Sequence, residues 1–126
     1  MYNVPEDLKY TKTHEWFRLE GNVAIVGITD YAQHQLTDIV YVEFPKKDSE
    51  QKSGERLLTI ESVKSAEDVF SPVTGKVTEV NQEVSSKPEL LNKDPYKNWL
   101  VKIRAVDAEK SNYLTASQYK GLIAEK

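Results

Sequence analysis

Short stretches of alternating hydrophobic and polar residues, separated by turn signals, run along most of this chain. This pattern is typical of β-strands, and the expected strands cover residues 15–20, 23–28, 39–44, 56–60 and 68–71. Gly21-Asn22 predicts a hairpin turn between the first two strands. Residues 23–28 are apolar on both faces, so we expect that strand to be covered on both sides. The pattern therefore predicts a mainly β protein.

Helical spacing occurs in two places. Residues near 29–36 predict a short helix with Thr29 as N-cap, ending near Thr37-Asp38, and its apolar positions are Ile28, Ala32 and Leu36. Residues 115–118, Thr-Ala-Ser-Gln, form a capping box. It precedes an apolar stripe made of Tyr119, Leu122 and Ile123. We therefore expect a C-terminal helix that packs on the sheets.

A weak internal repeat suggests how the strands are grouped. Residues 21–23 are echoed by residues 75–77, and residues 58–60 are echoed by residues 101–103. Each half runs strand, turn, strand, polar loop, strand. The repeat predicts two quasi-equivalent sheets packed face to face.

Composition limits the functional classes. With 126 residues the chain is expected to form one domain, residues 1–126, and its net charge of −3 argues against nucleic-acid binding. No apolar run approaches the roughly 18 residues of a membrane span, so no membrane partner is expected. The N-terminus resembles no targeting segment. We expect a cytoplasmic bacterial protein, or a mitochondrial matrix protein if a transit peptide has been removed.

The absence of cysteine limits the chemistry that this chain can carry. It excludes disulfides, thiolate nucleophiles and cysteine-based metal or iron–sulfur sites. Any thiol chemistry must therefore be supplied by a cofactor. The two histidines, His14 and His34, show no ligand spacing and are interpreted as structural or surface residues, so no metal is predicted.

Residues 61–67 lie between two expected strands and predict a hairpin tip. A two-residue tip usually carries Asn-Gly or Asp-Gly, because both central residues need positive φ. Val63-Lys64 stands there instead and places one amine at the end of a rigid projection. A lysine presented in this way suits covalent modification, although most turn lysines are only solvated. With a pKa near 10.4 the free amine is protonated at neutral pH, and acylation would remove its charge.

Several blocks of the sequence resemble one known family. Residues 61–64, 68–69 and 71–77 are similar to the lipoyl-attachment hairpin of the glycine cleavage system H protein. Further blocks match the same family in the same order, at residues 10–16, 27–33, 88–96 and 99–103. The resemblance covers roughly the whole chain. It implies a flattened barrel or sandwich of two antiparallel sheets, the barrel-sandwich hybrid of lipoyl and biotinyl modules.

The resemblance also implies a site. Lys64 would carry lipoate in amide linkage, within an environment for the arm and its ligase formed by Glu61, Ser62, Val63 and Ser65. Biotinyl modules usually have Met on both sides of the lysine, and lipoyl domains of 2-oxo acid dehydrogenases usually carry Asp-Lys-Ala. Here Val63 and Ser65 flank Lys64, so residues 61–64 resemble the H-protein form instead. A cleft lined by Thr13, Glu15 and Asp68 would hold the amine of an aminomethyl group. The alternative is that both acids are ordinary exposed residues.

The function implied is that of a carrier without an active site of its own. Glycine decarboxylase, which depends on pyridoxal phosphate, would load the arm with an aminomethyl group. A tetrahydrofolate-dependent aminomethyltransferase would unload it, and dihydrolipoamide dehydrogenase would reoxidise the dithiol. A lipoate ligase or transferase would attach the lipoate, and we expect the carrier to be a monomer. The alternative function is a lipoate or octanoate donor or relay protein for other lipoyl domains. The sequence contains neither a nucleophile–base motif nor a phosphate-binding glycine loop, so it does not support an autonomous enzyme.

The sequence departs from the family in places. Thr37 stands where glycine is usual after the first helix, so the resemblance does not predict how that helix ends. In the loop 46–53, Lys47, Asp48 and Gln51 replace an apolar residue, a glycine and another apolar residue. Lys97-Asn98 precedes Trp99 where the family usually has a glycine and one more residue. We therefore expect the attachment hairpin to be kept more closely than the surrounding surface.

Overall fold

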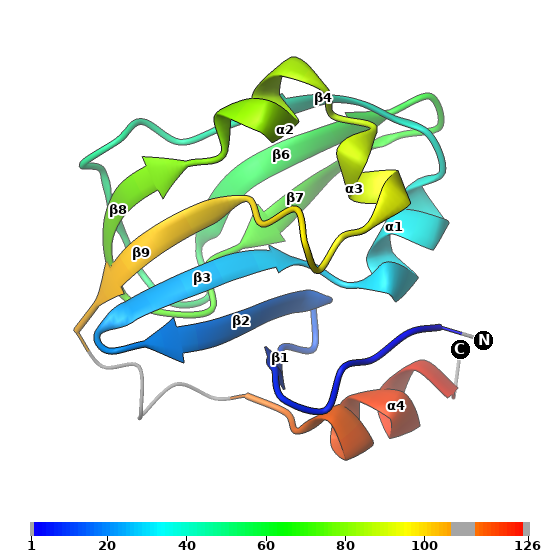
Figure 1. Cartoon of the computed structure of the whole chain (residues 1–126), viewed down its shortest axis with the longest axis horizontal. Helices are drawn as coiled ribbons and strands as arrows, with labels where there is room; N and C mark the ends of the chain where they lie inside the picture. Colours follow the sequence, from blue (N-terminus) through cyan, green and yellow to red (C-terminus); the bar gives the residue numbers. More distant parts are fainter. Residues whose placement is uncertain (1, 107–112, 125–126) are drawn as a thin grey trace.

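Two antiparallel sheets form the framework of the computed structural model, which describes residues 2–106 and 113–124 (Figure 1). The larger sheet has the strand order β1-β2-β3-β9-β8-β5 and the smaller one β4-β6-β7. The strands are β1 (Lys9–Tyr10), β2 (Glu15–Glu20), β3 (Val23–Ile28), β4 (Ile39–Glu43), β5 (Glu50–Gln51), β6 (Arg56–Ser62), β7 (Ala66–Phe70), β8 (Gly75–Val80) and β9 (Val101–Ala105). The helices are α1 (Asp30–Leu36), α2 (Gln82–Ser86), α3 (Leu90–Lys93) and α4 (Ala116–Ala124). The mainly β class is confirmed.

The main hydrophobic core lies between the two sheets. The larger sheet contributes Phe17, Val26 and Ile103, and the smaller sheet contributes Leu58 and Ile60, all fully buried. Because side chains alternate along a strand, the intervening residues of β2 and β3 face the other way. They join a second cluster, which includes Trp16, Ile25 and Tyr119 of α4. The strand 23–28 is thus covered on both faces, as its sequence predicts.

Both predicted helices are present with their predicted caps. The Thr29 hydroxyl accepts a hydrogen bond from the Ala32 N–H at 3.2 Å, which begins α1. At α4 the Gln118 N–H donates to the Thr115 hydroxyl and the Thr115 N–H donates to Gln118 Oε1, which completes the capping box. Figure 1 shows α4 beside β1, on the side of the larger sheet that carries the second cluster. In the described part of the chain, no helix is long and apolar enough to cross a membrane.

The sheets are not equivalent, so that part of the repeat prediction is wrong. One sheet has six strands and the other three. Residues 58–60 and 101–103 do fall in different sheets, but Val23 and Val77 lie in the same one. Two short helices, α2 and α3, were also not predicted from the sequence. A repeat of a few residues reflects common turn and strand preferences, which recur without any symmetry of the fold.

Gly27 is required by the packing of the second cluster. A Cβ atom built at this position would lie 2.6 Å from the indole of Trp16, which is fully buried. The indole Nε1 donates a hydrogen bond to the Pro95 carbonyl at 3.1 Å, so the ring is fixed from both sides. Only glycine allows β3 and the ring to approach this closely.

Candidate functional site: a lysine-tipped hairpin beside a cleft

The hairpin of β6 and β7 lies where the sequence predicts it. The last strand pair is Glu61 with Ala66, and the Ser62 N–H donates to the Ser65 carbonyl at 2.8 Å. Val63 and Lys64 therefore form the tip. Neither residue has positive φ. The Ser62 hydroxyl instead accepts hydrogen bonds from the N–H groups of Lys64 and Ser65, both at 3.1 Å, so a side chain fixes the turn that glycine would otherwise permit.

Helix α1 supports this tip from one side. The Val63 N–H donates to the Asp38 carbonyl at 2.9 Å, just beyond the end of α1. The Lys64 ammonium Nζ lies 3.3 Å from the Gln35 carbonyl oxygen, to which it donates. Carbonyls at a helix C-terminus carry partial negative charge, so this position suits a cation. Lys64 is otherwise exposed to solvent, and its amine is accessible from outside.

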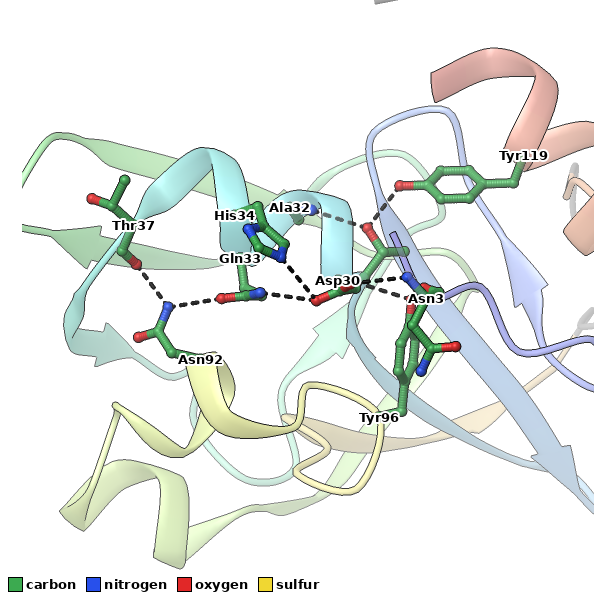
Figure 2. Close-up of polar contacts among 10 residues, drawn as sticks. Asn3, Asp30, Ala32, Gln33, His34, Thr37, Asn92, Tyr96 and Tyr119 are labelled. Atoms are coloured by element: carbon green, nitrogen blue, oxygen red, sulfur yellow. Dashed lines mark hydrogen bonds and ion pairs between the residues drawn. The ribbon is translucent and has the colours of Figure 1, made fainter. Parts of the chain in front are cut away.

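A polar network holds α1 in place (Figure 2). Asp30, the first residue of α1, accepts a hydrogen bond from the Asn3 N–H and another from Gln33 Nε2, both at 2.9 Å. Asn92 of the α3 segment donates to Gln33 Oε1 at 3.0 Å and to the Thr37 carbonyl at 2.8 Å. The N-terminal segment and α3 thus fix the two ends of the helix that supports Lys64.

Two positions at which the resemblance leads us to expect glycine have a glycine-type backbone here. Thr37 ends α1 with φ +63° and ψ −144°, and Asp48 has φ +71°. Asp tolerates positive φ, but a β-branched residue such as Thr rarely adopts it. The exit of the helix therefore has the geometry expected for glycine, although threonine occupies the position.

A cleft of about 460 Å³ begins at Lys64 and runs between α1, residues 13–15 and β7. It brings together five of the residues predicted from the sequence, which are Thr13, Glu15, Lys64, Ser65 and Asp68. Its remaining lining residues are His14, Ile28, Tyr31, Ala32, Gln35, Leu36, Glu67 and Val69. The other predicted residues, Glu61, Ser62 and Val63, form the outer part of the hairpin.

Glu15 is a buried carboxylate, with an exposed fraction of 1%. Its Oε1 accepts hydrogen bonds from the hydroxyls of Thr11 and Thr13, both at 2.5 Å, and its Oε2 accepts one from the Phe70 N–H at 3.0 Å. Burial raises the pKa of Glu15 above its ordinary value, and the hydrogen bonds from Thr11, Thr13 and Phe70 oppose that rise. Glu15 is therefore not an ordinary exposed acid.

Asp68 is placed differently from Glu15. It pairs across the sheet with Thr59, whose hydroxyl donates to Asp68 Oδ1 at 2.9 Å, and Arg56 Nε lies 3.4 Å from the same oxygen. Its carboxylate thus takes part in an exposed polar group on the outer face of the smaller sheet. Glu67, one residue earlier, pairs with the buried Ile60 and so projects from the opposite face, toward the cleft. Alternation along β7 is the signal that could have identified Glu67.

The sequence predicts a structural or surface role for His14, and in the structure this residue also lines the cleft. Its Nδ1 lies 2.8 Å from the Tyr119 hydroxyl, which also lies 2.7 Å from the Thr29 hydroxyl. His14 has φ +75°, and its ring centroid is 4.7 Å from that of Tyr31. His34 is exposed, and its Nε2 lies 3.7 Å from Asp30 Oδ1. No group of three or more potential metal ligands occurs within residues 2–106 and 113–124.

A sandwich of two antiparallel sheets that presents a single lysine on a hairpin tip, beside a cleft, defines a carrier module of the lipoyl and biotinyl type. The family can also be stated. The family model described as glycine cleavage H-protein matches residues 8–126, and the chain belongs to that family.

Relatives and a solved structure agree with this assignment. The chain is 62% identical over 125 residues to a "Probable glycine cleavage system H protein" of Picrophilus torridus, covering 99% of this chain and 100% of that one. A protein of the same description from Thermoplasma acidophilum is 62% identical over 123 residues, covering 98% of both. The crystal structure of a glycine cleavage system H protein from Mycobacterium marinum superposes with a TM-score of 0.88 at 31% identity, covering 96% of this chain and 99% of that chain.

These findings establish the general function. The chain is the lipoyl-carrier component of the glycine cleavage system, which acts as a shuttle and is not itself an enzyme. The predicted family, fold class and function are confirmed.

Proposed function

We propose that Lys64 is the residue that carries lipoate, in amide linkage. The observation that carries this proposal is that Lys64 lies exposed at a rigid hairpin tip and borders the same cleft as Thr13 and Glu15. An acylated Nζ keeps one N–H. That N–H can still donate to the Gln35 carbonyl, which lies 3.3 Å from Nζ, and so direct the start of the arm along α1.

The cleft offers a place for a charged amine next to the arm. Bound lipoate would supply a disulfide that can be reduced and can carry the aminomethyl group on one of its two sulfurs. Glu15 supplies a carboxylate at the inner wall of the cleft, with Thr13 donating to it at 2.5 Å. A cationic amine placed there would gain a charge-assisted hydrogen bond and would compensate the buried negative charge. We propose Thr13 and Glu15 as the amine-holding pair, with Asp68 as a peripheral carboxylate.

The partners follow from the assigned system. We propose that the carrier exchanges its arm among a pyridoxal-phosphate-dependent glycine decarboxylase, a tetrahydrofolate-dependent aminomethyltransferase and dihydrolipoamide dehydrogenase, after acylation by a lipoate ligase or transferase. We further propose that residues 1–126 act as one carrier domain and as a monomer. A cytoplasmic location stays a prediction. No observation on the described residues favours the alternative role as a lipoate relay.

Intact-mass spectrometry tests the attachment residue. Incubation with a purified lipoate–protein ligase, lipoate and ATP should add one lipoyl mass, and peptide mapping should place it on Lys64. K64R should gain no mass, whereas the matched control K76R, altered in a strand of the other sheet, should be modified like the wild type. Addition on another lysine, or none at all, would show that the assignment is wrong.

The cleft is tested on the loaded carrier. The rate at which the aminomethyl group is lost from the arm by hydrolysis should rise in E15Q and T13V, because the amine loses its partners. D68N should change this rate much less, because the carboxylate of Asp68 contacts Thr59 and Arg56. Equal protection in wild type and E15Q would remove Glu15 from the proposal.

A further inference from the structure

Exposed large hydrophobic side chains gather at one end of the molecule. Val40, Tyr41 and Val63 have exposed fractions of 54%, 51% and 68%. Among the described residues, the other exposed large hydrophobics are Val106 and Tyr113, on different segments. Scattered single apolar residues are normal on a surface, but a group of them beside a functional group is typical of a binding surface.

Strand pairing places these three residues around the tip. β4 is an edge strand, and its pairing with β6 shifts register between Ile39 and Tyr41, so Val40 lies in a bulge. Tyr41 pairs with Glu61, three residues before Lys64. Val63 adjoins Lys64, and its N–H is bonded to the Asp38 carbonyl, two residues before Val40. We refer to Val40, Tyr41 and Val63 as the apolar rim.

The charge around the rim is negative on balance. Residues 38–43 and 61–68 together carry five carboxylates and one lysine, Lys64, and Arg56 forms ion pairs with two of the carboxylates, Glu43 and Asp68. A partner that covers the rim would therefore meet apolar side chains in a region of net negative charge. Its complementary surface would be an apolar pocket with basic residues at the edge.

We propose that the apolar rim is the docking surface for the enzyme that acylates Lys64, a proposal that rests on the attachment site assigned above. The acylating enzyme must bring an activated carboxyl group into bonding distance of Nζ on the unmodified side chain, and so must cover the residues next to it. Enzymes that use the finished arm meet its far end and can bind at a greater distance.

The reaction to be catalysed defines the probe. With an acyl-adenylate as donor, the Lys64 ammonium first loses a proton, and neutral Nζ then attacks the acyl carbon. The C–N bond forms, the C–O bond to the phosphate breaks, AMP leaves, and the nitrogen loses a second proton. No electron transfer is involved. A purified lipoate–protein ligase that modifies the wild-type chain, supplied with lipoate and ATP, is therefore the assay enzyme.

A matched pair of double variants tests the surface. V40S/Y41S removes most of the rim but leaves Val63 and Lys64 unchanged, and V106S/Y113S removes a Val and a Tyr of similar exposure elsewhere. Truncation of a central interface aromatic commonly weakens binding tenfold or more, so kcat/KM for acylation of V40S/Y41S should fall by at least about tenfold, mainly through KM. V106S/Y113S should be acylated like the wild type, and equal thermal unfolding temperatures would show that both variants fold.

A competition experiment separates docking from chemistry. K64A cannot be acylated but keeps the rim, so it should inhibit acylation of the wild type competitively. Adding V40S and Y41S to K64A should raise its inhibition constant about tenfold or more, whereas adding V106S and Y113S should not. This readout does not depend on the reactivity of any lysine.

The outcomes separate the two proposals. Acylation of wild type at Lys64 together with unchanged kinetics and inhibition for the rim variants would overturn the docking surface and leave the attachment site intact. Failure of the ligase to modify Lys64 would overturn both. Normal acylation of V40S/Y41S with a loss only in exchange with glycine decarboxylase would assign the rim to that partner, and the present proposal would be wrong.

Discussion

Replacement of Thr37 by glycine should stabilise this protein, although it removes atoms and a hydrogen bond. Thr37 has φ +63° and ψ −144°, a region close to one occupied almost entirely by glycine. Its backbone cannot relax easily, because its N–H donates to the Gln33 carbonyl at 3.1 Å and its carbonyl accepts from Asn92 at 2.8 Å. The strain is therefore kept in the folded state.

The expected gain can be worked from its parts. A non-glycine residue held in such a conformation costs about 1–3 kcal/mol. Against this, glycine gives the unfolded chain more freedom, at about 0.5–1 kcal/mol. The bond from the Thr37 hydroxyl to the Leu36 carbonyl is also lost, and a partly exposed bond of this kind contributes about 0.5 kcal/mol. The net stabilisation should be about 1 kcal/mol, or about 4 °C in melting temperature.

The assay is urea unfolding of wild type, T37G and T37A, with the slope compared among them. T37A loses the hydroxyl but keeps Cβ, so it should be less stable than T37G by about 1–2 kcal/mol. In an unstrained backbone the order is reversed, and alanine is favoured by about 0.5–1 kcal/mol. D48G should gain less than T37G, because Asp tolerates its φ of +71°. T37A as stable as T37G would refute the argument.

Three further predictions follow from other contacts. G27A should lose about 1–3 kcal/mol in denaturant unfolding, because its Cβ would lie 2.6 Å from Trp16, whereas G121A, in open space on α4, should gain up to about 1 kcal/mol. Burial raises the pKa of Glu15 above its ordinary value of 4.5, so the folded state binds that proton more tightly than the unfolded chain. The unfolding free energy of wild type relative to E15Q should therefore be highest below that value and fall as pH rises through the folded pKa, and a flat difference across a urea-unfolding pH series would contradict this. N92A should lose about 1–3 kcal/mol by the same measurement, because three hydrogen bonds at the exit of α1 disappear, and a neutral result would exclude Asn92 as its support.

The sequence predicts element boundaries most accurately where turn or cap residues flank a stretch of alternating hydrophobic and polar residues. The bounds of β2 and β3 agree with the prediction because Gly21-Asn22 separates them and Thr29 ends the second strand. The C-terminal helix is predicted by its capping box. By contrast, α2 and α3 have five and four residues, which is too short for a helical period to stand out.

The candidate site divides in the same way. The position of Lys64 follows from local sequence, because a hairpin tip depends only on the strands that flank it. The environment of Glu15 follows only in part, because Thr11 and Thr13 are local partners but Phe70 is 55 residues away. The contact between His14 and Tyr119 spans 105 residues. Such groups are brought together only by the packing of separate elements, and no periodicity in the chain predicts that packing.

The single helix α1 links the stability of the fold to the geometry of the site. Its C-terminal end bonds both to Lys64, through Gln35, and to the hairpin backbone, through Asp38, while Tyr31 on the same helix lines the cleft. A shift of α1 against the sheets would therefore disturb both the contacts that support the tip and the cleft, whose other walls are residues 13–15 and β7. The strained exit at Thr37 lies at the junction of these contacts, so T37G should change stability more than it changes the rate of acylation at Lys64.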